Sequence, residues 1–153
     1  MERTILAVDP GVGGGIAGYH PYQSQVECCK MPDGVSEIWK IVPSGGGVAY
    51  IEDVPKYCGG KIASSSTAVL FRNFGRVEGL LTALGWRVIL VPPKEWQARL
   101  NLGGRKSVES QAAWKRKLKE EAERRFPNSS VTLATADALL ILDYAMEKEG
   151  IKR

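Results

Sequence analysis

The first stretch of regular structure in this sequence ends in an unusual way. An apolar run that begins at Ile5 stops at Asp9, and Pro10 and four glycines (11, 13, 14 and 15) follow it in "ILAVDPGVGGGIAGYH". Glycines at such density allow a tight turn. They either wrap a phosphate at the start of a helix, or fold a hairpin that presents Asp9 as a metal ligand. The hairpin is favoured, because "GGIAGYH" continues with a strand pattern.

Apolar periodicity and turn residues divide the rest of the chain into ten elements. We expect strands at residues 4–9, 14–20, 25–31, 48–54 and 86–91, and helices at 35–42, 64–85, 93–100, 106–126 and 134–150. The first three strands form an antiparallel meander, and strands alternate with helices after it. This order predicts an α/β fold in one domain (residues 1–153), with a mixed five-stranded sheet flanked by helices.

Composition excludes several classes of protein. The chain has 153 residues, 44% of them apolar and 25% charged, and no apolar run approaches the ~20 residues of a membrane span. Because the N-terminus enters a strand pattern directly, with no secretory signal, we expect a cytoplasmic protein with no membrane partner. Three cysteines and a single histidine disfavour a disulfide framework, a zinc site and a Ser-His nucleophile.

The charge of the chain is concentrated in one segment. The net charge is +4, and residues 94–125 hold ten Lys or Arg against five Glu. Basic residues on a helix are usually its solvated face, but here they carry the whole positive excess of the chain. This pattern is typical of a polyanionic partner.

Three acids lie among apolar neighbours. Asp9 ends the first strand, Glu52 lies in "AYIEDVP" and Asp137 lies in "TADALLIL". A buried carboxylate costs several kcal/mol unless something pairs with it, and no Lys or Arg is placed locally to pair with all three. Each acid could be separately solvated or capped. A shared divalent cation, Mg²⁺ or Mn²⁺, explains all three together.

The order "LAVDPGVGGGIAGY", "YIEDVP", a glycine-bearing helix and "ADALLI" resembles the RuvC-type Holliday junction resolvases, and most of all the short variants of bacteriophage and organellar kind. The resemblance covers nearly the whole chain and implies a ribonuclease H-like fold. It also implies that Asp9, Glu52 and Asp137 are the catalytic metal ligands. RuvC proper has a fourth acid three residues before the last, where this chain has Ala134. Asp143 lies about 9 Å along the helix axis from Asp137, too far to replace that acid.

The resemblance further implies a reaction. Two Mg²⁺ ions per site, with Mn²⁺ as a substitute, would support hydrolysis of a phosphodiester to a 5′-phosphate and a 3′-hydroxyl. Lys94, just after "VPP", is either a catalytic residue that reaches the scissile phosphate or a solvated lysine. The implied partners are branched DNA, above all a four-way junction, and a second copy of the chain, because two symmetric strands are cut.

Other residues are candidates for DNA binding and dimerisation. Tyr57, flanked by Lys56 and Lys61, would insert at the junction, and Arg72 and Arg76 would meet phosphates. General phosphate contacts are expected from Lys106, Lys115, Lys117 and Lys119. Helix 64–85 is expected to form the dimer through Phe71, Phe74, Gly75 and Gly79, where small residues allow close approach; alternatively, these glycines pack on the chain's own sheet.

Three other functions stay open. An ATP-binding protein of the actin and sugar-kinase type also begins with Asp-x-Gly, but that fold needs a second lobe with its own phosphate loop. A non-catalytic module that binds junctions is consistent with the absent fourth acid. A different nuclease of the ribonuclease H-like superfamily could act on RNA–DNA hybrids or flaps.

Overall fold

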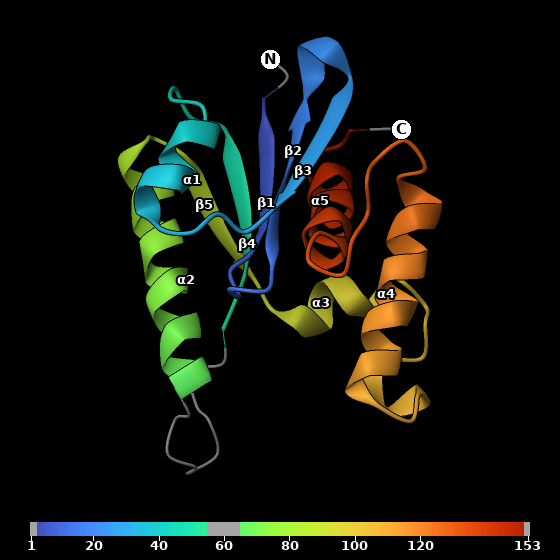
Figure 1. The fold of residues 1–153 in the computed structure, drawn as a ribbon. Coiled ribbons are helices and arrows are strands. Elements are labelled where there is room, and N and C mark those ends of the chain that lie inside the picture. Colours follow the sequence, from blue (N-terminus) through green and yellow to red (C-terminus); the bar gives the residue numbers. More distant parts are fainter. Residues whose placement is uncertain (1–2, 55–64, 152–153) are drawn as a thin grey trace.

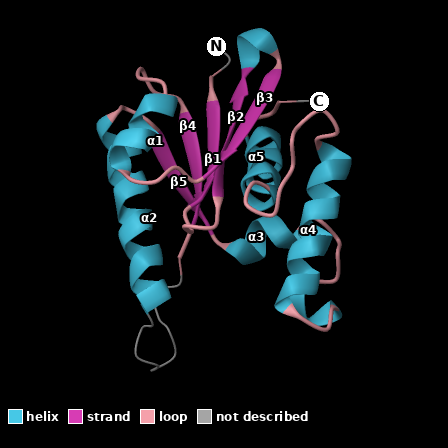
Figure 2. Ribbon diagram, in the orientation of Figure 1, coloured by secondary structure: helices cyan, strands magenta, loops and turns pink. Residues whose placement is uncertain are grey.

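The computed structural model describes residues 3–54 and 65–151, which form a five-stranded sheet with helices on both faces (Figures 1 and 2). The strands lie in the order β3-β2-β1-β4-β5. Their bounds are β1 (Ile5–Asp9), β2 (Gly15–His20), β3 (Gln25–Lys30), β4 (Val48–Glu52) and β5 (Arg87–Val91). The predicted α/β class and mixed sheet are confirmed.

The sheet changes direction at β1. On one side, β1, β2 and β3 are antiparallel, with Asp9 opposite Gly15 and Gly15 opposite Lys30. On the other side, β1, β4 and β5 are parallel, with Val8 beside Ile51. Asp9 and Glu52, one residue further on, therefore end neighbouring strands at the same edge of the sheet.

The helices are divided between the two faces. α1 (Val35–Ile41) and α2 (Ser65–Ala83) cover one face. α5 (Ala136–Lys148) packs on the other, over β1, β2 and β4, and α4 (Gln111–Arg125) lies against α5. α3 (Pro93–Ala98) follows β5. No helix of the described residues is long and apolar enough to cross a membrane.

Each face has its own apolar core. On the α5 side, five consecutive residues of this helix, 138–142, are 0% exposed. The predicted stripe of α4, Trp114, Leu118 and Ala122, completes that core. On the other face, α2 contributes Val77 and Leu81. The apolar periodicity used to predict these helices therefore reflects their buried faces.

The start of α4 differs from the prediction. The helix begins at Gln111 and not at 106, because Ser110 caps it by accepting a 3.0 Å hydrogen bond from the Ala113 amide. Gly103 and Gly104 have φ values of 81° and 74°, and a separate 3₁₀ turn, Arg105–Ser107, follows them. Lys106 is therefore in this turn and not on the helix.

Candidate active site

The glycine-rich segment folds as a hairpin that holds Asp9. The Gly14 amide donates to the Gly11 carbonyl at 2.9 Å, and the Gly11 amide donates to Asp9 Oδ1 at 3.2 Å. A Cβ built on Gly14 would lie 2.4 Å from the Asp9 carbonyl oxygen and 2.6 Å from Asp9 Cγ. Glycine is required at position 14 because the Asp9 carboxyl group occupies the space of a side chain. The predicted hairpin is confirmed.

Glu52 is held by a residue that sequence reasoning missed. The indole Nε1 of Trp96, in α3, donates to Glu52 Oε2 at 2.8 Å. Trp96 is 0% exposed, so its only polar atom has no water to bond. The sequence carried a weak signal, since Trp96 follows the strand that pairs with the strand of Glu52.

Asp137 lies in the first turn of α5, where the helix dipole favours a carboxylate. It is 3% exposed. A Cβ on Gly15 would lie 2.7 Å from the Ala134 carbonyl oxygen, so the start of α5 packs directly on the end of β2. This close approach brings the last of the three acids to the sheet edge where the other two lie.

The three carboxylates interact electrostatically. Burial first, and the Asp137 charge second, raise the pKa of Asp9 to about 6. Burial, and then the charges of Asp9 and Asp137, raise the pKa of Glu52 to about 8. Carboxyl groups whose pKa is raised by burial and by a neighbouring like charge are a common feature of functional sites.

Lys115 of α4 enters this cluster, which the sequence did not predict. Its Nζ contacts Asp137 Oδ2 in an ion pair. Burial lowers the pKa of Lys115, but Asp137, Asp9 and Glu52 together outweigh burial and raise it overall. In the sequence, nothing distinguishes Lys115 from Lys117 and Lys119, which were predicted with it as phosphate contacts.

The donor set fits a hard cation. In the described part of the chain, no three Asp, Glu, His or Cys side chains form a ready-made metal cluster. However, Asp137 Oδ1 is buried and has no hydrogen-bond partner among the described residues. Buried polar oxygens normally have a partner, and this one lies within a group of carboxylates whose charges repel. Carboxylate oxygens are the ligands that Mg²⁺ prefers.

With this geometry established, the chain can be compared with solved structures. T. thermophilus RuvC in complex with a Holliday junction substrate superimposes with a TM-score of 0.58 and 14% identity, over 97% of each chain. A second Thermus thermophilus RuvC structure gives a TM-score of 0.53 and 16% identity, over 96% of each chain. The chain has the RuvC fold. No family model and no curated protein matches the sequence.

Asp143 and Lys94, the other two residues considered for the site, do not join the acid cluster. Asp143 pairs with Arg125 at 2.5 Å and with Arg99 at 3.2 Å, in agreement with the expectation that it does not replace the fourth acid. Lys94 is exposed in the first turn of α3 and makes no hydrogen bond or ion pair with a described residue. Its catalytic role stays a prediction.

The predicted DNA contacts lie in several places. Arg72 and Arg76 are exposed on α2. Lys117 donates to the Leu102 carbonyl at 2.8 Å, and Lys119 pairs with Glu123, so both have partners within the chain. Tyr57, Lys56 and Lys61 lie outside the described residues.

The residues predicted for the dimer lie on α2. Phe74 packs partly on the core beneath, while Phe71 is 36% exposed. A Cβ on Gly75 or Gly79 would meet nothing within 4 Å. The glycines therefore do not pack on the chain's own sheet, which was the alternative explanation for them.

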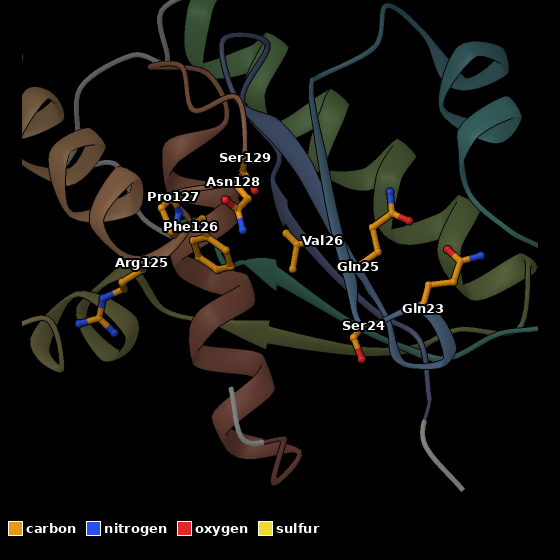
Figure 3. Close-up of a pocket in the computed structure, with 9 residues that line it drawn as sticks. All are labelled: Gln23, Ser24, Gln25, Val26, Arg125, Phe126, Pro127, Asn128 and Ser129. Atoms are coloured by element: carbon orange, nitrogen blue, oxygen red, sulfur yellow. The ribbon is translucent and has the colours of Figure 1, made fainter.

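A pocket of about 460 Å³ lies at the opposite edge of the sheet (Figure 3). It is formed by the tip of the β2–β3 hairpin and the segment after α4, and Gln25, Arg125, Phe126 and Asn128 line it. Arg125 also pairs with Glu121 at 2.6 Å. Since both Glu121 and Asp143 neutralise this arginine, the pocket carries no surplus positive charge from it.

Proposed function

We propose that the chain is a metal-dependent endonuclease that cuts four-way or other branched DNA as a homodimer in the cytoplasm. The observation that carries the proposal is the cluster of Asp9, Glu52 and Asp137, acids from three separate elements: Asp137 is buried, and its charge contributes to the raised pKa values of Asp9 and Glu52. It is supported by the RuvC fold on which this cluster lies.

Asp9, Glu52 and Asp137 would hold two Mg²⁺ ions per site, with Mn²⁺ as a substitute. Bound there, the metal would supply an activated water and charge stabilisation for phosphodiester hydrolysis, leaving a 5′-phosphate and a 3′-hydroxyl. The chain's own groups prepare this: the hairpin orients Asp9, and Trp96 orients Glu52. The Lys115 ammonium neutralises Asp137, a role that a bound cation would share.

The remaining predicted residues complete the proposal. Lys94 would approach the scissile phosphate, and the basic residues of α2 and α4 would bind the DNA backbone. The exposed glycines of α2 would let a second chain approach closely and place two sites for two symmetric strands.

The test is a cleavage assay with labelled four-way junction, linear duplex and RNA–DNA hybrid, in Mg²⁺ and in Mn²⁺. Paired symmetric nicks on the junction, with ligatable ends, are expected. Asp9→Asn, Glu52→Gln and Asp137→Asn should each lose cleavage and keep junction binding. If no junction is cut, or if one of these variants cuts at the wild-type rate, the proposal or that assignment is wrong.

The same assay separates the other functions. Junction binding without cleavage indicates a non-catalytic module, and cleavage of the hybrid alone, or of a flap substrate added to the assay, indicates a different ribonuclease H-like nuclease. ATP turnover without DNA cleavage would favour the nucleotide-binding alternative.

A further inference from the structure

A groove of about 430 Å³ lies on the α2 side of the sheet, next to the Asp9 hairpin. Three segments that are distant in the sequence form it: the turn at Val12, the end of β3 with its connection to α1, and the N-terminal half of α2. Basic side chains line it from two of these segments, Lys30 from β3 and Arg72 and Arg76 from α2.

The groove and the acids share one edge of the sheet. The pairing of Asp9 with Gly15 and of Gly15 with Lys30 places Lys30 at the end of the sheet where Asp9 lies. Alternation along β1 turns Val8 towards the α2 core, so Asp9 faces the α5 side, where Asp137 lies. The hairpin 10–14 therefore separates the acids from the groove.

The hairpin 10–14 is attached to α2 and to the segment after β3 by hydrogen bonds. Asn73, which is 7% exposed, donates from Nδ2 to the Pro10 carbonyl at 2.6 Å. The Met31 amide donates to the Gly14 carbonyl at 2.9 Å from the other side. These two hydrogen bonds hold the helix, the hairpin and the β3 connection together beside Asp9.

The basic side chains of the groove are not neutralised by ion pairs within the described part of the chain. Lys30, Arg72 and Arg76 are exposed, and none of them forms an ion pair with another described residue. Asp33 is the one acid among the lining residues. Basic side chains gathered in a concave surface attract a polyanion. The pocket in Figure 3 differs, because its arginine is already paired with two acids.

We infer that this groove binds the backbone of the cleaved DNA strand, beside the phosphate that would lie at the acid cluster. Lys30, Arg72 and Arg76 would contact successive phosphates. The strand would cross the hairpin at Val12, which is 57% exposed and offers an apolar contact for a sugar. This inference rests on the proposed function and adds to it the path of the strand and a role for Lys30.

The experiment measures binding of the full chain to a labelled four-way junction in EDTA, over a range of salt concentrations. In the triple variant Lys30→Gln, Arg72→Gln, Arg76→Gln, the slope of log K against log salt should become shallower by about two to three, because each lost phosphate contact removes about one. Each single variant should lose about one. Arg3→Gln, which removes an exposed cation before the other end of β1, is the matched control and should keep the wild-type slope.

A second measurement locates the contacts on the DNA. Neutral methylphosphonates are placed one at a time along the cleaved strand. On one side of the cut they should weaken wild-type binding but leave binding by the triple variant unchanged. If the wild type binds and cuts the junction and the triple variant behaves as Arg3→Gln in both measurements, the groove does not bind the strand. If the wild type neither binds nor cuts, the proposed function itself fails.

Discussion

The indole of Trp96 donates a 2.8 Å hydrogen bond to the Glu52 carboxylate, which links α3 to the end of β4. This hydrogen bond lowers the pKa of Glu52, opposing the larger effects of burial and of the neighbouring acids. The pKa of Glu52 is therefore about 8, and the buried Trp96 Nε1, followed by the Lys115 charge, keeps it from rising further.

Trp96→Phe keeps most of the packing and removes this donor. The pKa of Glu52 should rise further, so the acidic limb of the pH profile of DNA cleavage should move to higher pH. Loss of the hydrogen bond should lower stability by about 1–2 kcal/mol. Trp86→Phe is the control, because its Nε1 donates to the Pro43 carbonyl at 3.1 Å, away from the acids. An unchanged pH profile for Trp96→Phe would contradict this role.

Stability without metal should fall as the pH rises. Asp9 and Glu52 have raised pKa values in the folded chain, so between their ordinary values near 4 and about 8 the folded state binds more protons than the unfolded one. The free energy of unfolding then decreases with pH across this window. Thermal melting in EDTA should show this decrease, and Glu52→Gln should flatten it. A wild-type melting temperature that rises from pH 5 to pH 8 would disprove the coupling.

Gly14→Ala should disturb the site much more than Gly13→Ala. A Cβ at position 14 would overlap the Asp9 carbonyl and carboxyl groups, whereas a Cβ at position 13 would meet nothing within 4 Å. We expect a loss of about 1–3 kcal/mol for Gly14→Ala, the usual range for overpacking, together with loss of DNA cleavage. Chemical denaturation and the junction assay measure both. Equal behaviour of the two variants would show that the hairpin does not position Asp9.

Lys115→Met should destabilise the metal-free protein, because it leaves Asp137 buried and unpaired. The lysine is partly exposed, so the expected cost is about 1–3 kcal/mol, below the range for a fully buried pair. Lys119→Met, which breaks an exposed pair with Glu123, should cost about 0.5 kcal/mol or less.

The same variant tests whether lysine and metal compete. Half-maximal thermal stabilisation of Lys115→Met should need less Mg²⁺ than that of the wild type, since the ammonium no longer occupies Asp137. If both proteins need the same Mg²⁺ concentration, the ammonium and the ion do not share this carboxylate.

Gly75→Leu tests the proposed dimer. In a single chain, a side chain at position 75 enters open space, so the variant should fold normally. If a second chain packs there, the leucine should shift the protein from dimer to monomer in sedimentation velocity. Ser36→Leu, which adds the same side chain on the exposed surface of α1, should leave the dimer intact. A Gly75→Leu protein that stays dimeric would place the interface elsewhere.

The sequence predicts the elements well because their apolar periods are strong and their ends are marked by Pro, Gly or Ser. It also draws attention to Asp9, Glu52 and Asp137, whose charges interact in the structure, since acids within apolar runs are conspicuous. It does not reveal Trp96 or Lys115, whose roles depend on how α3 and α4 pack against the sheet. Trp96 reads as a core residue and Lys115 as one of several basic residues, and only tertiary contacts separate them from the others.

The parallel pairing of β1 and β4 has a consequence for which substitutions the site can tolerate. The separation of the Asp9 and Glu52 backbones is set by the hydrogen-bonded ladder, at about 4.8 Å between neighbouring strands, and not by any particular side chain. Core residues around them can be exchanged for others of similar volume without moving either carboxylate. The spacing of the two acids therefore tolerates wide change in the side chains of the core, because it depends on the pairing of the two backbones.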